Sequence, residues 1–197
     1  MDKKIVIGIS GASGAIYAKE IINILLEIND SSLKIAIVIT DTAKSVWKSE
    51  LGEDISIFFD AISKKGIEIL DNHSFYVSYA SGSAAADAFI IVPCSAGTFG
   101  RIASGISNDL IGRIADVQLK ERKQLIIAVR ESPLNLIHLR NLTTLSEAGA
   151  IIAPVSPTYY NNPSEISEIV NTYAKRLLSL TNVYKLKNNE QWSSKQG

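Results

Sequence analysis

Short, almost continuous apolar stretches that end in small polar residues are the feature that most constrains how this chain can fold. Residues 5–9 read Ile-Val-Ile-Gly-Ile and lead into the small residues 10–14. Residues 88–92 read Ala-Phe-Ile-Ile-Val and lead into a second such segment at 93–98. A stretch of this length that is apolar throughout predicts a strand buried on both faces, as in a parallel sheet covered by helices.

Helical patterns alternate with these strands along the chain. After residue 14, apolar side chains recur at helical spacing from Ala15 to Leu26. Residues 55–79 are harder to assign, and 58–70 are expected to hold a helix or an irregular connection. Further strands are predicted at 33–40, 124–129 and 150–154, and further helices from Asp41, over 99–120 with an interruption at 105–108, over 133–148 and over 164–180.

This alternation predicts an α/β protein of one domain, with a Rossmann-like, doubly wound parallel sheet and helices on both faces. The length of 197 residues suits a single domain of this kind. We assign residues 1–186 to the α/β domain and residues 187–197 to a polar carboxyl-terminal tail that contains Trp192. Ligands of such folds bind outside the carboxyl ends of the strands, where the polar segments of this chain lie.

Composition argues against several kinds of partner and location. Lysine plus arginine and aspartate plus glutamate number 20 each, so the net charge favours neither nucleic acid nor a membrane surface. No apolar stretch approaches the ~20 residues that span a bilayer, and the first residues lead into a strand without a signal-peptide core. Cys94 is the only cysteine, which excludes an internal disulfide and fits a reducing compartment. A cytoplasmic protein is therefore expected.

The two turns that follow the apolar strands are candidate phosphate sites. In residues 10–14, small residues let backbone amides and the Ser13 hydroxyl close on a phosphate at a helix N-terminus, although a tight turn with a serine cap explains them equally well. Residues 95–98, Ser-Ala-Gly-Thr, repeat the device, and two such turns in one sheet favour a ligand bound across a crevice. The glycines at 8, 11 and 14 do not form the G-x-G-x-x-G fingerprint, which argues against an NAD(P) domain.

A locally basic segment adds possible anion ligands. Arg130 and Glu131 directly follow an apolar strand, and Arg113 and Lys120 precede them in the same segment. Arginine offers two parallel hydrogen bonds to a phosphate or to the carbonyl edge of a flavin. In the loop 156–163, one of the two tyrosines at 159 and 160 is expected to pack and the other to present its hydroxyl, and spacing does not choose between them.

Three other reactive side chains are interpreted as structural. Cys94 ends a buried strand with no histidine nearby in the sequence, so a packed thiol is favoured over a nucleophile. His73 and His138 lack metal-ligand spacing, and no metal site is predicted. The residues alone thus predict an α/β domain with a crevice for a phosphorylated, nucleotide-like ligand.

Seven segments taken together resemble the UbiX-type flavin prenyltransferases, which belong to a flavoprotein fold. They follow one another in order over most of the chain: GISGASGAIY at 8–17, SGS at 81–83, VPCSAGT at 92–98, GISNDLI at 105–111, RIADVQLKER at 113–122, RESPL at 130–134 and PTYY at 157–160. The family commonly has Phe-Tyr-His in the last segment, whereas this chain has Tyr159-Tyr160-Asn161. The resemblance therefore carries a role to Tyr160 and none to Asn161.

The resemblance implies a metal-independent enzyme that joins a dimethylallyl group, usually from the monophosphate, to N5 and C6 of reduced FMN. The product, prenylated FMN, serves a UbiD-type decarboxylase, and the family assembles as dodecamers. The residues implied to hold FMN are Gly11, Ala12, Ser13, Thr40, Ser95, Ala96, Gly97, Thr98 and Arg130. Those implied to hold the prenyl phosphate are Arg113, Lys120, Tyr160 and Arg176, with Trp192 closing over the site. Whether Arg113 comes from the same subunit or across a subunit interface stays open at this point.

The resemblance also implies roles in catalysis. Ser13, Glu50, Lys120, Glu131 and Tyr160 match active-site positions, and Glu131 is the candidate for proton transfer. Two alternatives stay open: a non-catalytic FMN carrier or accessory subunit, and an FMN-dependent cysteine decarboxylase of the same fold. The latter group carries a methionine-containing substrate clamp, and Met1 is the only methionine of this chain.

Overall fold

A computed structural model describes residues 2–28 and 30–184 of the chain. Six parallel strands form one sheet in the order β3-β2-β1-β4-β5-β6. The strands are β1 (Lys3–Ile9), β2 (Leu33–Ile39), β3 (Glu68–Leu70), β4 (Ala88–Cys94), β5 (Gln124–Val129) and β6 (Ile151–Ile152). The predicted doubly wound α/β fold is confirmed. The predicted tail, 187–197 with Trp192, lies outside the described residues.

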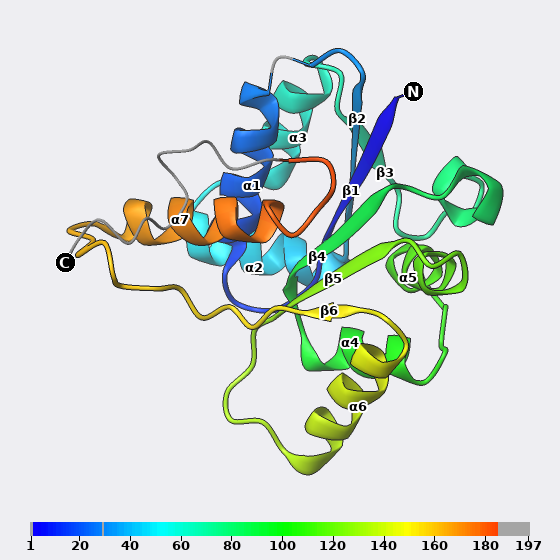
Figure 1. Cartoon of the computed structure of the whole chain (residues 1–197). Helices are drawn as coiled ribbons and strands as arrows, with labels where there is room; N and C mark the ends of the chain where they lie inside the picture. Colours follow the sequence, from blue (N-terminus) through cyan, green and yellow to red (C-terminus); the bar gives the residue numbers. More distant parts are fainter. Residues whose placement is uncertain (1, 29, 185–197) are drawn as a thin grey trace.

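Seven α-helices connect and cover the strands (Figure 1). They are α1 (Ala15–Glu27), α2 (Asp41–Leu51), α3 (Ile55–Ser63), α4 (Ala96–Ala103), α5 (Leu110–Lys120), α6 (Leu136–Glu147) and α7 (Ile166–Leu178), and two 3₁₀ turns, η1 (Ser78–Ala80) and η2 (Gly82–Ala84), precede β4. None of these helices, all within the described ranges, has the length and apolar character needed to cross a membrane.

The alternation of side chains along each strand builds two cores, one on each face of the sheet. On β1, Ile5, Ile7 and Ile9 pack beneath α1, α2 and α7, whereas Val6 packs beneath α4 and α5 on the other face. All four side chains are fully or almost fully buried. Strands buried on both faces are continuous in apolar residues because neither face meets water, which is why the pattern at 5–9 predicted this fold.

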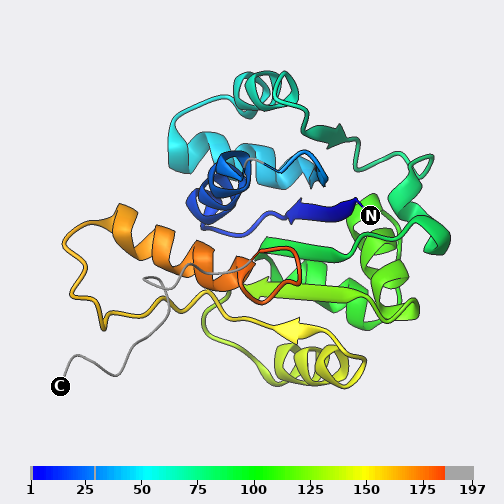
Figure 2. The same ribbon diagram turned by 45° about the horizontal axis from the view of Figure 1, so that its top comes forward.

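Residues 55–79 are the segment that the sequence did not resolve. They contain α3 and then β3, an edge strand of three residues. A strand this short carries too few alternating positions to be distinguished from a loop. Figure 2 shows β3 at one edge of the sheet and β6, next to α6, at the opposite edge.

The centre of the sheet brings the two predicted turns together. The strands β1 and β4 are hydrogen-bonded neighbours, with Ile5 opposite Ala88 and Gly8 opposite Ile91. The chain proceeds outward from β1 to β2 and β3 on one side, and from β4 to β5 and β6 on the other. Such a reversal opens a crevice at the carboxyl ends of the two central strands. The turns after β1 and β4 therefore lie on either side of this crevice.

Candidate functional site

A pocket of about 390 Å³ lies at this crevice, which is within the range of small-ligand sites. Three helices begin at it: Thr40 caps α2, Ser95 caps α4 and Asp109 caps α5. The positive ends of three helix dipoles thus face one space, an arrangement that attracts an anion. The lining residues are Gly11, Thr40, Asp41, Thr42, Asn72, His73, Ser95, Thr98, Arg101, Asn108 and Asp109.

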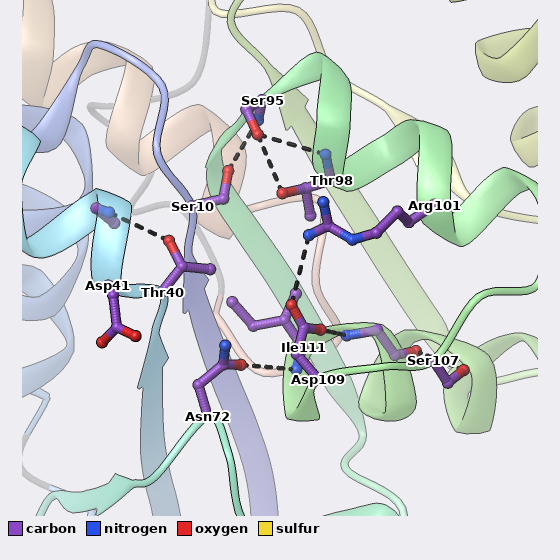
Figure 3. A network of polar contacts seen from close by, with 12 residues as sticks. Ser10, Thr40, Asp41, Asn72, Ser95, Thr98, Arg101, Ser107, Asp109 and Ile111 are labelled. Atoms are coloured by element: carbon purple, nitrogen blue, oxygen red, sulfur yellow. Dashed lines mark hydrogen bonds and ion pairs between the residues drawn. The ribbon is translucent and has the colours of Figure 1, made fainter.

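Ser10 holds the two central turns together. Its hydroxyl donates to the Pro93 carbonyl at 2.9 Å and accepts from the Ser95 amide at 2.8 Å, and the side chain is buried. The Ser95 hydroxyl in turn lies 3.0 Å from the Thr98 hydroxyl and accepts from the Thr98 amide (Figure 3). The hydroxyls of the second turn are therefore fixed in place before any ligand binds.

Gly11 lets the chain approach α2 closely at this point. A Cβ added to Gly11 would lie 2.5 Å from Cγ2 of Thr42, a contact that real side chains do not make. The absence of a side chain at residue 11 therefore brings the turn after β1 against the start of α2. This contact forms the wall of the pocket between Gly11 and Thr40.

The first turn itself is occupied by a carboxylate of the protein. Glu50, at the end of α2, accepts from the amides of Gly14 at 2.9 Å and Ala15 at 2.8 Å, at the N-terminus of α1. Gly14 has φ of 110°, a left-handed conformation that favours glycine. The predicted phosphate site at residues 10–14 thus has the Gly14 amide already paired, and the N-termini of α2, α4 and α5 lie at the pocket instead.

Glu50 is also held as an anion. Burial raises the pKa of its carboxyl, but the hydrogen bonds from Ser13, Gly14 and Ala15 and the charge of Arg130 outweigh burial and bring the pKa below its ordinary value. Ser13, Glu50 and Arg130, which are far apart in the sequence, therefore lie close together beside the pocket.

We expect Glu50→Ala to lower the free energy of unfolding by about 1–2 kcal/mol at neutral pH, because it removes the cap of α1. Since the pKa of Glu50 is lowered by folding, its contribution is present above the unfolded-state pKa and is lost as pH falls through the folded-state pKa. The difference between variant and wild type in urea unfolding should therefore shrink toward acidic pH. Glu27→Ala, an exposed change at the other end of α1, is the control, and a difference that does not depend on pH would contradict this role.

The two charged residues after β5 behave differently from each other. The Arg130 amide donates to the Cys94 carbonyl at 3.1 Å, which continues the pairing of β5 with β4 and fixes the backbone there. The Glu131 carboxylate accepts only a local hydrogen bond, from the Ser132 amide at 3.1 Å, and is exposed. Arg130 thus belongs structurally to the turn with Ser13 and Glu50, whereas Glu131 projects from the same edge with its carboxylate accessible.

Lys120 and Arg113 lie away from the pocket of their own subunit. Lys120 is the last residue of α5, so it lies about 15 Å along the helix axis from the pocket at the first turn. Its ammonium pairs with Glu121 at 2.8 Å, and both groups lie over Gly82. Arg113 donates to the Ala80 carbonyl at 3.1 Å and pairs with Asp116 at 3.0 Å. The structure therefore does not bring these two cations to the pocket of their own subunit.

Tyr160 and Arg176 lie on the segment after β6. Tyr160 is 82% exposed in the loop before α7, and Tyr159 is also exposed, so neither tyrosine is the packed one that the sequence predicted. That part is taken by Tyr173 of α7, whose hydroxyl contacts the carbonyls of Ala153 and Pro154 at the start of the loop. The Arg176 guanidinium lies 3.4 Å from the Ser179 hydroxyl at the end of α7.

Cys94 is confirmed as a buried residue. Its side chain is fully inaccessible, and burial raises the pKa of the thiol far above its ordinary value. A thiol that stays protonated is a poor nucleophile.

Sequence reasoning missed several residues of the pocket, chiefly Asn72, Arg101 and Asp109. Residues 105–108 were predicted as an interruption between helices and 105–111 as part of the family resemblance, but neither gave Asp109 a role, and Asn72 lies in the stretch that could not be assigned. A polar residue directly before a helix is a capping signal, so the role of Asp109 as the N-cap of α5 could have been predicted. Arg101 and Asn72 carry no comparable signal, because only the fold brings them to the pocket.

The chain matches known proteins along most of its length. The Flavoprotein family model matches residues 1–178. A protein of Methanocaldococcus jannaschii named flavin prenyltransferase UbiX is 41% identical over 180 residues, which cover 91% of this chain and 94% of the relative. This chain belongs to the UbiX family. It is therefore a flavin prenyltransferase by family, as the motifs predicted.

Two solved structures support the UbiX assignment. A crystal structure of AnUbiX (PadA1) in complex with FMN and dimethylallyl pyrophosphate has a TM-score of 0.88 at 31% identity and covers 98% of both chains. A dodecameric FMN-dependent UbiX-like decarboxylase from Escherichia coli O157:H7 has a TM-score of 0.83 at 29% identity and covers 93% of this chain and 98% of the other. The UbiX fold therefore extends over nearly the whole chain.

Proposed function

We propose that this chain joins a dimethylallyl group from dimethylallyl phosphate to N5 and C6 of reduced FMN, giving prenylated FMN. The observation that carries the proposal is the pocket on which three helix N-termini converge, in a chain 41% identical to a flavin prenyltransferase. AnUbiX, whose fold matches this chain, binds FMN together with dimethylallyl pyrophosphate. The same two classes of molecule are the substrates proposed here.

The pocket and the neighbouring turn fit the flavin nucleotide. A phosphate at the pocket would meet the hydroxyls of Thr40, Ser95 and Thr98 and the positive ends of α2 and α4. The isoalloxazine would then lie toward Ser13, Glu50 and Arg130, which the fold gathers beside it. The residues proposed to bind FMN are Gly11, Ala12, Ser13, Thr40, Ser95, Ala96, Gly97, Thr98 and Arg130.

The prenyl phosphate is proposed to bind a cationic group completed by a second copy of the chain. Arg113, Lys120, Tyr160 and Arg176 are the residues proposed for it, with Trp192 of the tail closing over them. Because Lys120 lies about 15 Å along α5 from the pocket of its own subunit, we assign Lys120 and Arg113 to the site of a neighbouring subunit.

A surface on α6 supports this assembly. Leu136, Ile137 and Leu139 are 60%, 68% and 48% exposed, respectively, on one short stretch of helix. Apolar groups gathered in this way mark a contact surface. A relative of the same fold is dodecameric, and we propose a homo-oligomer of that kind for this chain.

The residues divide the chemistry between them. When the C–O bond of the dimethylallyl phosphate breaks, negative charge builds on the phosphate, and Lys120, Arg113 and Arg176 would stabilise it. New bonds to N5 and C6 replace an N–H and a C–H bond, so two protons leave the flavin. One must reach the departing phosphate, and the other must add to the double bond of the prenyl group, whose other carbon then bonds to C6. Glu131, with its accessible carboxylate, is proposed to transfer a proton, and Ser13 and Glu50 to position the N5 edge.

Three further assignments belong to this proposal. Residues 1–186 form the flavin-binding domain and residues 187–197 a closing tail. The product passes to a UbiD-type decarboxylase, because prenylated FMN is useful only to an enzyme that binds it as a cofactor. A cytoplasmic enzyme fits these roles, since reduced FMN needs a reducing compartment.

The proposal is tested by supplying the purified protein with reduced FMN and dimethylallyl monophosphate without air. Mass spectrometry should detect an adduct one prenyl unit heavier than FMN, formed also in the presence of EDTA. Unchanged FMN, with the diphosphate tried as well, would contradict prenyl transfer and favour a flavin carrier. Boiled protein and oxidised FMN serve as controls.

A further inference from the structure

Asn72, a largely buried residue, presents a hydrogen-bond donor to the pocket. The residue is 7% exposed, its side-chain Oδ1 accepts from the Ile111 amide at 3.1 Å, and its backbone carbonyl accepts from the Leu110 amide at 2.9 Å. Because Ile111 N–H can only donate, the atom that faces it must be the amide oxygen, which fixes the orientation of the side chain. The Nδ2 group then points into the pocket (Figure 3) and has no hydrogen-bond partner among the described residues.

Nδ2 is accessible from the pocket and pairs with no group among the described residues, so it is free to donate to a ligand or to ordered water. Asn72 already caps α5 through its oxygen, so a carboxylate of the same shape would serve that purpose at least as well at a helix N-terminus. The amide nitrogen is the feature that capping does not explain. It indicates a ligand that accepts hydrogen bonds.

Arg101 supplies a cation to the same space. It is the only arginine or lysine in the pocket lining among the described residues, and it lies on α4 above Asn72 (Figure 3). One guanidinium nitrogen lies 3.4 Å from Asp109 Oδ2, a long contact for an ion pair, and Asp109 Oδ1 accepts from the Gly112 amide at 2.7 Å. Asp109 therefore orients Arg101 weakly and leaves most of its five N–H groups for a ligand.

The other charges around the pocket are already compensated. Asp41 pairs with Lys44 at 2.8 Å and with His73 at 3.0 Å, and these contacts lower the pKa of its carboxyl. Arg101 and Asn72 thus face the hydroxyls of Thr40 and Thr98 across the pocket without an uncompensated carboxylate between them. A phosphate monoester suits this donor set, since it offers several acceptor oxygens and up to two negative charges.

We propose that Asn72 and Arg101 bind the phosphate of the flavin and make the site select FMN over the unphosphorylated flavin. The proposal rests on the function proposed above, in that it assigns this pocket to the flavin nucleotide. It adds two contacts that neither the motifs nor the hydroxyl turns supply.

The test compares affinities for FMN and riboflavin, which share the isoalloxazine and ribityl groups and differ in the phosphate. Asn72→Asp keeps the oxygen that caps α5, removes the free donor and adds a negative charge, so the fold should persist. Asn72→Asp and Arg101→Ala are each expected to raise the dissociation constant of FMN about 10–100-fold in titration calorimetry. The riboflavin constant should change by no more than about twofold.

Matched controls exist for both changes. Asn135 likewise caps a helix through its amide oxygen, since its Oδ1 accepts from the His138 amide of α6 at 2.8 Å, and Arg140 is an exposed arginine of α6. Asn135→Asp and Arg140→Ala should leave both affinities within about twofold of wild type. Equal weakening of FMN and riboflavin by the Asn72 or Arg101 variants would overturn the proposal, as would unchanged FMN affinity.

A second arm separates the two possible sources of phosphate. At saturating FMN, Arg101→Ala should not change the KM for dimethylallyl phosphate. A raised KM with unchanged FMN affinity would assign the pocket to the prenyl donor and overturn the proposal. Because the affinity measurements need no turnover, wild-type protein that binds FMN tightly without forming the prenyl adduct would refute the proposed function while leaving this inference testable.

Discussion

Lys120→Ala is expected to lower the rate of adduct formation by about 10²–10³-fold, the usual effect of removing one donor that stabilises charge in the transition state. FMN affinity should stay within about twofold of wild type, since Lys120 lies far from the pocket of its own subunit. Rates are measured without air by mass spectrometry, and FMN binding by titration calorimetry. Lys123→Ala, a change at a lysine paired with Asp87 just beyond α5, is the control.

Mixed assemblies test where Lys120 acts. If Lys120 serves a neighbouring subunit, co-expression of Lys120→Ala with Glu131→Gln creates some sites that have both residues intact. Random assembly of equal amounts would restore about a quarter of the sites in an arrangement of this kind. Activity no higher than that of the two variants assayed separately would contradict the assignment across the interface. Light scattering must show that each variant forms an oligomer of the same size as the wild type.

The fold followed from the sequence because its main determinants are local. Residues 5–9 contain no polar side chain, and this continuity excludes a half-exposed strand, in which apolar and polar residues alternate. The start of α4 could be predicted from Ser95, because an N-cap involves only its own side chain and the next three residues. β3 escaped prediction because three residues at a sheet edge gain their conformation from pairing with β2 rather than from their own pattern.

The site was predictable only in part because its groups come from distant segments. The hydroxyls of Ser95 and Thr98 were found, since the turn that carries them is continuous in sequence. Glu50 was named only through family resemblance, and its contacts with Gly14 and Ala15 span 36 and 35 residues, respectively. Asn72 meets the pocket through a hydrogen bond to Ile111, a separation of 39 residues that no local pattern encodes.

The same reasoning applies to the cationic group, because spacing along the chain does not show which subunit supplies each residue. In the sequence, Arg113 and Lys120 precede Arg130 by 17 and 10 residues, which suggests one cluster. The helix α5 places Lys120 far from Arg130, because α5 begins at the pocket after Asp109 and ends at Lys120, toward the opposite end of the strands. Residues brought together by a subunit interface leave no trace in the spacing along one chain.

Glu131→Gln is expected to lower turnover by about 10²–10⁴-fold, the range for removing a general acid or base. The substitution keeps the shape of the side chain and an oxygen that can accept from the Ser132 amide, so the local backbone should not change. FMN affinity is expected to persist, because the pocket that we assign to the phosphate does not include Glu131. The measurements are single-turnover rates over a range of pH, together with calorimetry of FMN binding.

The control is Glu27→Gln, which removes an exposed carboxyl group on α1. It shows whether the effect is specific to the carboxyl group of Glu131. If Glu131 transfers a proton, the variant should also lose one ionisation from the pH–rate profile, which a purely structural role would not remove. Loss of FMN binding together with turnover would instead make Glu131 a structural residue of the turn after β5. Retained turnover would exclude it as the proton-transfer group and direct attention to Glu50, whose carboxylate is held as an anion by Ser13, Gly14 and Ala15.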